Sequence, residues 1–463
     1  MLTQLGAAMV GLADSIMVGH YGTADLAAVS FSNALFFTVM VFSMGAVMAV
    51  TPLVGHETGR IEKALSEPGD KTDYIAEKRL KISAYLINGV VFTLLLCVFS
   101  LLILAPCIPL LDAFGQEPEV VACARPYYIL IVLSIVPFLL FCFCKQFLEG
   151  LGNTTVAMLI TLGCNLLNIG LNWIFIFGHC GFSPMGAAGA GWASLLSRCL
   201  MPVCFMAVIC FKREWRSYVT AIRSWLVNRS EVEHLITLGV PIGLQSFAEA
   251  FLFTASFVII GWINKEALAA HHIANQMADL TFMLALGIGA ATTIRVSHQL
   301  GKGDLHAVRM ASRASVHLCL LMNTIGAAIM IFGRHHIPYI FTDDPQVIPI
   351  ASTLLVIAGT LQYADGLQCI GAAMLRGIQD VRVPMRIALF AYLGVALPLG
   401  IYLTFYYPLP FGDAATAGLG AKGMWIAFVI ALAIPAVLFP IRFHRQMKRM
   451  SKITNDQDLT IVK

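Results

Sequence analysis

Charged side chains are scarce in this sequence. Asp, Glu, Lys and Arg together make up 12% of the 463 residues, whereas a soluble domain contains about 25%. Hydrophobic residues reach 58%, and the mean hydropathy is +0.80. This composition excludes an ordinary soluble protein. It predicts an all-α integral membrane protein, because a helix satisfies its own backbone hydrogen bonds in lipid.

Motifs that would indicate other functions are also missing. The sequence has no G-x-x-x-x-G-K-[ST] loop, so we expect no ATP binding by this chain. It has no H-E-x-x-H or comparable nucleophile motif, which argues against an enzyme. The net charge is only +4 and the basic residues form no patch, so we expect no nucleic-acid partner. We also expect no cofactor.

The 12 cysteines are scattered, mostly within apolar runs, and none of them forms a C-x-x-C pair. Disulfide frameworks and structural metal sites use closely spaced pairs of this kind. We therefore predict free thiols that face lipid or the protein core.

Twelve apolar segments predict membrane-spanning helices, for which about 20 residues are needed. These segments are residues 2–18, 27–55, 84–111, 122–145, 154–179, 188–211, 235–262, 269–298, 310–333, 347–374, 384–407 and 418–443. They divide the chain into an N-terminal lobe (1–211), a connecting segment (212–234), a C-terminal lobe (235–443) and a basic, polar tail (444–463).

Lysine and arginine are distributed unevenly around these spans. Cytoplasmic loops of membrane proteins carry an excess of both residues. If the N-terminus is cytoplasmic, the basic segments 56–83, 212–234 and 444–463 all lie inside the cell. Only Arg125, Lys265, Arg334 and Lys422 then lie outside, and Arg198 lies within a span. We predict an inner-membrane protein with both termini in the cytoplasm.

The two halves of the chain repeat each other. Leu26-Ala27-Ala28, Gly45, Thr51, His56 and Gly59 recur in the same register as Leu268-Ala269-Ala270, Gly287, Thr293, His298 and Gly301. Leu148-Glu149-Gly150 matches Leu375-Arg376-Gly377, and Gly186, Gly189 and Trp192 resemble Gly420, Gly423 and Trp425. Six spans per repeat predict parallel repeats, and therefore two pseudo-symmetric six-helix bundles around a central cleft.

The repeat is incomplete at the start of the chain. Residues Glu231 to Leu244, which open the second half, have no counterpart in the first half. We expect either a short first helix that its neighbours complete, or a start that lies further upstream.

Two carboxylates of the second half lie in the middle of apolar segments. Glu249 is central in 237–262 and shares a helix face with Gln245; Asp365 shares a face with Gln362 and Gln368. A charge at the centre of a membrane helix costs about 2.5–3.5 kcal/mol on insertion scales. We predict that both carboxylates form a cation-coupling site. The alternatives are a structural contact between helices for Glu249, and backbone donors at a helix break beside Gly366 for Asp365.

The first half contains a second polar set. Asp14 is the only charge before His20, and Thr161, Asn165, Asn168 and Asn172 share one face of the fifth span. Amide groups can coordinate a cation through oxygen or donate to a carboxylate through nitrogen. We predict a polar site that combines Asp14 with amides of this helix face, with Ser194 as a further partner. Helix packing is the alternative.

His271 and His272 lie near the outer end of the eighth span. For this pair we favour hydrogen bonding at the membrane interface over metal binding.

Several short stretches are distinctive enough to compare with known families. They are Gly11 to Gly19 (GLADSIMVG), Asp25-Leu26-Ala27-Ala28, Ala269-Ala270-His271, Leu286 to Val296, and Met374-Leu375-Arg376-Gly377. These stretches resemble the multidrug and toxic compound extrusion (MATE) family, in particular its NorM-like bacterial branch, and the resemblance covers nearly the whole chain.

The resemblance implies twelve helices in two lobes and export of bulky organic cations, driven by sodium or proton entry. It also implies that Asp14, Glu249 and Asp365 are the ion-linked positions, with Asn168 and Asn172 beside Asp14. The sequence departs from the family in its short first helix, in Ser297-His298 where Gly-Gln is commoner, and in Asp279 within the eighth span. We expect Asp279 to add a polar contact in the cleft.

We therefore predict a monomeric secondary active antiporter that exports small amphipathic cations by alternating access, with membrane lipid around it. Sodium is favoured over the proton as coupling ion, because Gln362 and Gln368 supply amide oxygens beside Asp365. A lipid-linked sugar flippase is the nearest alternative, but it would need a cationic cavity. A channel or receptor would need no coupled ion site.

Reporter fusions test the predicted topology. Fusions after Gly69, Asn228 and Lys452 should report the cytoplasm and a fusion after Gly412 the opposite side, because basic segments stay inside. A reproducible signal from the wrong side at any of these positions would contradict the span assignment.

Overall fold

The computed structural model describes residues 14, 16–114, 117–212, 215, 218, 227–407 and 418–461, and every regular element in these ranges is helical. Among them are 11 segments long and apolar enough to cross a membrane, and each predicted span from 27–55 onward overlaps one of these, with ends that differ by a few residues or more. The span 2–18, most of the connecting segment and Gly412 lie outside the described residues. The protein is therefore a multi-pass helical membrane protein.

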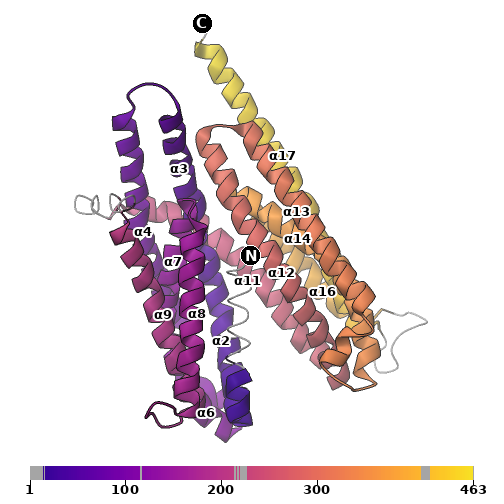
Figure 1. Ribbon diagram of the computed structural model, residues 1–463. Coiled ribbons are helices and arrows are strands. Elements are labelled where there is room, and N and C mark those ends of the chain that lie inside the picture. The colour runs from indigo at the N-terminus through magenta and orange to yellow at the C-terminus, as the bar shows by residue number, and fades with distance from the viewer. Residues whose placement is uncertain are drawn as a thin grey trace. The chain divides into compact units, whose positions relative to one another are not determined.

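Residue contacts divide the chain into two compact units. The N-terminal unit, Leu2–Phe247, contains α2 (Thr23–Val47), α3 (Val50–Ser66), α4 (Thr72–Leu104), α5 (Cys107–Leu110), η1 (Leu111–Phe114), α6 (Pro118–Leu133), α7 (Ile135–Gly150), α8 (Thr154–Phe177), α9 (Gly186–Phe211) and the first part of α11 (Arg229–Gly261). Within it α8 packs along α9, and α9 also contacts α6 and α7 (Figure 1).

The C-terminal unit, Ala248–Lys463, begins within α11. It contains α12 (Lys265–Lys302), α13 (Leu305–Gly333), η3 (Ile337–Ile340), α14 (Val347–Gly377), α15 (Arg382–Leu389), the π-helix η4 (Phe390–Ala396), α16 (Leu397–Phe405) and α17 (Ala421–Ile461). Helix α14 is central, because it packs against α12, α13 and α17 (Figure 1). Trp425, Phe428 and Phe439 of α17 are fully buried in the core of this unit.

Several helices extend beyond the predicted apolar spans. Helix α4 begins at Thr72, and α12 covers Lys265–Lys302. Helix α17 continues to Ile461, so the predicted polar tail is helical over residues 444–461. Hydropathy detects only the part of a helix that meets lipid, whereas the polar ends continue because Lys, Arg, Gln and Met are good helix formers. All 12 cysteines are free, as predicted.

The sequence repeat is also a repeat of helix contacts. In the N-terminal unit Thr51 Oγ1 donates to the Gln146 carbonyl at 2.9 Å. In the C-terminal unit the matching Thr293 Oγ1 donates to the Ala373 carbonyl at 3.1 Å. One turn later the matching glycines, Gly150 and Gly377, lie directly against valines. A methyl group on Gly150 would be 2.8 Å from Val54 Cβ, and one on Gly377 would be 2.7 Å from Val296 Cβ.

The last helix of each repeat begins in the same way. The Met185 N–H donates to the Phe175 carbonyl at 3.0 Å, and the Leu419 N–H donates to the Leu403 carbonyl at 2.9 Å. The residue that follows is a glycine with positive φ, +53° at Gly186 and +60° at Gly420. This left-handed conformation costs glycine little, which explains its presence at both positions.

The tryptophans that follow these glycines are not equivalent. Trp192 is 45% exposed, whereas Trp425 is 0% exposed. Trp425 follows Gly423 by two residues, whereas Trp192 follows Gly189 by three. A shift of one residue rotates a side chain by about 100° around a helix. The indole of Trp425 donates to His271 Nδ1 at 3.0 Å.

His271 is buried, and both of its ring nitrogens have partners. Since the indole nitrogen of Trp425 can only donate, His271 Nδ1 accepts. Nε2 lies 3.0 Å from Ser256 Oγ, and that hydroxyl donates to the Phe253 carbonyl. Nε2 therefore carries the proton, and His271 makes hydrogen bonds to protein side chains through both nitrogens.

The segment without a repeat counterpart packs closely on α2. Gly239 and Gly243 are separated by four residues on α11, the spacing that lets two membrane helices approach. A methyl group on Gly239 would be 2.8 Å from the Ala46 carbonyl oxygen, and one on Gly243 would be 2.6 Å from that of Phe42. This contact assigns the first part of α11 to the N-terminal unit.

The paired glycine contacts predict matched effects on stability. Gly150→Ala and Gly377→Ala should each lower the free energy of unfolding by about 1–3 kcal/mol, because the valine Cβ atoms cannot move aside. Gly163→Ala is the control, since a methyl group there would meet nothing within 4 Å. It should be neutral, or should raise stability by about 0.5–1 kcal/mol. Thermal unfolding of purified protein in detergent measures these changes. Equal behaviour of all three variants would contradict the close packing.

Candidate functional site

One glutamine joins the two predicted carboxylates in the C-terminal unit. Gln368 Nε2 on α14 donates to Glu249 Oε1 on α11 at 2.7 Å and to Asp365 Oδ1, one turn away, at 3.2 Å. Asp365 and Gln368 are buried, and Glu249 is half-buried. The structure therefore brings Glu249, Asp365 and Gln368 together, as the polar stripes predicted.

Tyr392 fixes the orientation of this glutamine. Its hydroxyl donates to Gln368 Oε1 at 2.7 Å, so the amide nitrogen faces the carboxylates and the amide oxygen faces away. Tyr392 lies in the π-helix η4, which interrupts the α-helical register between α15 and α16. Such π-helical turns occur frequently at functional sites. The sequence did not indicate Tyr392, because a change from α to π register leaves no clear hydrophobic pattern.

Gln362 is buried one turn before Asp365. Its backbone carbonyl accepts a hydrogen bond from Asn323 Nδ2 of α13 at 2.8 Å. Its own Nε2 has no hydrogen-bond partner within the described part of the chain. Gly366 leaves room for Asn323, since a methyl group there would lie 1.9 Å from the amide nitrogen. Helix α14 continues through Gly366, so the alternative of a helix break beside Asp365 is wrong.

No hydrogen bond joins the two other predicted partners, Gln245 and Asp279, to this bridge within the described residues. Gln245 is buried one turn before Glu249 on α11. Asp279 of α12 is exposed and accepts a hydrogen bond from Asn275 at 3.0 Å. The negative charge of Asp279 still acts on Asp365, and the positive charge of Arg376 acts on Glu249.

The N-terminal unit contains a chain of hydrogen bonds that starts at Asp14. Asn172 Nδ2 donates to Asp14 Oδ1 at 2.5 Å and lies 3.4 Å from Asn168 Oδ1. Asn168 Nδ2 donates to Ser197 Oγ at 3.2 Å, and Ser197 in turn donates to the Ser194 carbonyl. Asp14, Asn168 and Asn172 thus come together as predicted. The hydroxyl that meets Asn168 belongs to Ser197, whereas Ser194 takes part through its backbone.

The other members of the polar stripe on α8 are not in this chain. Thr161 donates to the Ala157 carbonyl of its own helix. Asn165 is buried, and its Nδ2 has no partner among the described residues. The side-chain oxygen of Asn172 is also buried without a described partner. An acceptor of this kind beside a carboxylate can bind a cation or a donor of a cargo molecule.

Arg198 of α9 adds a positive charge to the same unit. Its Nη1 donates to Ser134 Oγ at 2.7 Å, and its guanidinium lies over the rings of Phe36 and Phe138 at 5.3 and 5.0 Å. It interacts electrostatically with Asp14. Sequence reasoning placed Arg198 within a span but assigned it no role. A lone arginine inside an apolar helix was the available signal.

The two polar sites therefore differ in charge. Asp14 has one buried opposite charge in its unit, Arg198. In the other unit Glu249 and Asp365 share a single bridging amide, and Arg376 acts on Glu249. The C-terminal site therefore holds two carboxyl groups where the N-terminal site holds one.

The ligand types restrict what either site can bind. Among the described residues no group of three or more His, Cys, Asp and Glu could hold a metal ion. Carboxylate and amide oxygens are hard ligands, which suit alkali cations or protons better than transition metals.

Comparison with known sequences identifies the family of this chain. The family model described as MatE matches residues 1–64, 73–174 and 241–402. The chain is 32% identical over 453 residues to a "Probable multidrug resistance protein NorM" of Rhizobium meliloti, covering 97% of this chain and 91% of that protein. It is 30% identical over 452 residues to "Multidrug resistance protein PmpM" of Pseudomonas aeruginosa, covering 97% of this chain and 90% of that protein.

Solved structures share the fold. The crystal structure of the eukaryotic MATE transporter AtDTX14 matches with a TM-score of 0.81 at 17% identity, covering 97% of this chain and 95% of that chain. An outward-facing multidrug resistance MATE family transporter matches with a TM-score of 0.79 at 20% identity, covering 98% and 94%. The chain therefore belongs to the MATE family of multidrug efflux transporters.

Proposed function

We propose that this protein exports amphipathic organic cations in exchange for sodium, by alternating access. The bridge between Glu249 and Asp365 is the observation that supports coupling to a cation, because two carboxylates from different helices meet inside membrane-spanning segments. Two relatives are named as multidrug resistance proteins, which supports drug-like cargo.

Exchange follows from competition for these carboxylates. A cation that binds the outward-facing form at Glu249 and Asp365 lowers the affinity for cationic cargo. The cargo then leaves, and the ion-loaded form returns inward. The free energy of sodium entry drives the export, and ATP takes no part.

Sodium binding requires a rearrangement of the bridge. In the structure Gln368 presents its NH2 group to the carboxylates and its oxygen to Tyr392. A half-turn of the amide would give the oxygen to a sodium ion and break the hydrogen bond that the Tyr392 hydroxyl donates; the hydroxyl would then have to turn and accept from the NH2 group. A proton would instead neutralise one carboxylate and leave the amide where it is. The hydroxyl of Tyr392 thus distinguishes the two coupling modes.

The Asp14 site has a different role in this proposal. Since Arg198 already supplies a positive charge, Asp14 attracts a sodium ion less strongly than the Glu249–Asp365 pair does. The site offers the amides of Asn168 and Asn172 and a buried free oxygen, which suit polar groups of a cargo molecule.

The remaining architectural expectations complete the proposal. Twelve helices form two six-helix bundles around a central cleft, with lobes at 1–211 and 235–443. The protein acts as a monomer in the inner membrane, with both termini in the cytoplasm. The excess of basic residues at one end of the helices supports this orientation.

Neutral variants of the two carboxylates test the ion site. Glu249→Gln and Asp365→Asn preserve size and hydrogen bonding but remove the charge. Each should fold and still bind cargo, while cation-driven efflux falls about tenfold or more, as expected for a loss of at least 1.4 kcal/mol of coupling. The measurement is drug efflux from reconstituted vesicles under separately imposed sodium and proton gradients.

The control for this experiment is Glu233→Gln. Glu233 is an exposed carboxylate that pairs with Arg229 at the start of α11. It should transport like the wild type. Undiminished cation-driven efflux in both Glu249→Gln and Asp365→Asn would rule out the site. Efflux that responds to pH but not to sodium would exclude sodium as the coupling ion and leave the assignment of the carboxylate site intact.

Tyr392→Phe tests how sodium binds. Removing the hydroxyl frees Gln368 Oε1, so the amide can turn without losing a hydrogen bond worth about 0.5–1.5 kcal/mol. The sodium concentration for half-maximal efflux should therefore fall by roughly 2- to 10-fold. Tyr363→Phe is the matched control, since its hydroxyl meets Thr324 at the exposed surface of α14. An unchanged or higher half-maximal concentration in Tyr392→Phe would contradict the amide rotation.

A further inference from the structure

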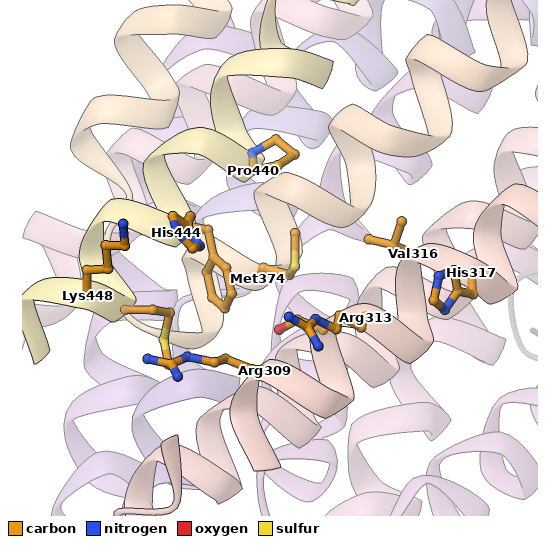
Figure 2. A pocket seen from close by; sticks show the side chains of 11 residues that line it. Arg309, Arg313, Val316, His317, Met374, Pro440, His444 and Lys448 are labelled. Carbon is orange, nitrogen blue, oxygen red and sulfur yellow. The ribbon is translucent and has the colours of Figure 1, made fainter. Parts of the chain in front are cut away.

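A cavity of about 380 Å³ opens in the C-terminal unit between α13 and α17. Helix α14 packs against both of these helices and supplies Met374 to the cavity wall (Figure 2). The site lies apart from the Glu249–Asp365 bridge, since none of its lining residues takes part in that bridge. Nothing in the proposed antiport mechanism uses it.

The polar lining of the cavity is strongly basic. Arg309, Arg313 and His317 follow one another at four-residue intervals and therefore share one face of α13. His444 and Lys448 have the same spacing on α17. Figure 2 shows the two sets on the two sides of the cavity. No Asp or Glu is among the lining residues.

A neighbouring basic residue on α17, Arg442, does have a carboxylate partner. Arg442 donates to Asp380 at 2.7 Å, and Gln446 donates to the same carboxylate at 2.9 Å. That arginine already has its counter-ion. The basic groups of the cavity instead face one another across an open space of the right size for an anionic group.

Apart from Ser312, the rest of the lining is apolar. In Figure 2 Val316 of α13 and Pro440 of α17 lie on the side of the cavity away from Arg309, and His317 lies beside Val316. Eight residues separate Pro440 from Lys448, which corresponds to about 12 Å along the helix axis. Met374, Phe443 and Met447 are buried and form the base. The cavity is therefore most basic at the end of Arg309 and Lys448 and more apolar at the other end, where His317 is the only basic lining residue.

The cavity lies where the distribution of basic residues predicts the cytoplasmic edge of the membrane. The basic end lies at the start of α13 and in the polar part of α17, where the positive-inside pattern places the cytoplasmic surface. The apolar end extends along the same helices toward the lipid core. A ligand that fits both ends has an anionic head and hydrocarbon tails.

We propose that this cavity binds the phosphate headgroup of an anionic phospholipid from the cytoplasmic leaflet. The guanidinium of Arg309 or Arg313 matches a phosphate in two-point geometry, and Lys448 adds a compact positive charge from the opposite helix. Basic pockets between helices on the cytoplasmic side attract such lipids. The acyl chains lie along Val316, Met374 and Pro440. The cationic cargo of the transporter is repelled from the same place.

A lipid bound here connects α13 and α17 across the end of α14. Helix α14 also carries Asp365 and Gln368, so the lipid stabilises the helix that holds the ion site. Anionic lipid should therefore raise the thermal stability of the whole C-terminal unit.

The test compares lipids on the purified full-length protein. Phosphatidylglycerol, phosphatidylcholine and inorganic phosphate are added separately to detergent-solubilised protein. The Tm and the lipid retained in native mass spectrometry are measured. Phosphatidylglycerol should raise the Tm of the wild type, and phosphatidylcholine should not. All of these measurements use the wild-type protein, so a folding defect in a variant cannot affect the result. Equal stabilisation by phosphatidylcholine, or by inorganic phosphate at equal concentration, would overturn the proposal.

Charge-matched variants locate the binding. Arg309→Gln with Lys448→Gln should weaken phosphatidylglycerol binding roughly 30-fold, from the loss of two favourable charges. Arg445→Gln with Arg449→Gln removes the same charge from exposed positions of α17 that do not line the cavity. This control should bind the lipid within about twofold of the wild type, the variation typical of distant surface changes. Equal weakening in both pairs would show a general charge effect and overturn the proposal.

Discussion

The amide of Gln368 is the interaction on which the functional part of this structure depends. It holds two carboxylates of different helices at one point within the membrane-spanning region. Two negative charges at that depth repel each other, and lipid gives them no solvation. The amide hydrogens reduce this cost by donating to one oxygen of each carboxyl group. The hydroxyl of Tyr392 determines which side of the amide faces the pair.

The two units use the same packing but different chemistry. Thr51 with Gly150 and Thr293 with Gly377 make the same contact between matching helices. Such contacts depend on backbone shape and tolerate no larger residue, so both halves have the same small side chains at these points. The polar positions are under no such steric restriction. One unit has an arginine near its carboxylate, and the other has two carboxylates and a bridging amide.

Two kinds of polar site lie at different depths in the C-terminal unit. Glu249 and Asp365 meet in the middle of their helices. Basic side chains gather at the end of α13 and along α17, around the cavity. We propose a small cation as the ligand of the first site and a lipid phosphate as the ligand of the second.

The sequence by itself determined the helical membrane class, the later spans, the repeated glycines and the meeting of Glu249 with Asp365. Hydropathy, helical periodicity and the cost of a buried charge are local properties, so they can be evaluated from the sequence without a structure. Only the tertiary structure decided which side chains meet between helices. In the structure Asn168 donates to the hydroxyl of Ser197 and not to that of Ser194, and Asp279 is exposed. A π-helical turn brings the hydroxyl of Tyr392 to Gln368. These outcomes depend on the rotation of one helix against another, and a change of one residue turns a side chain by about 100°.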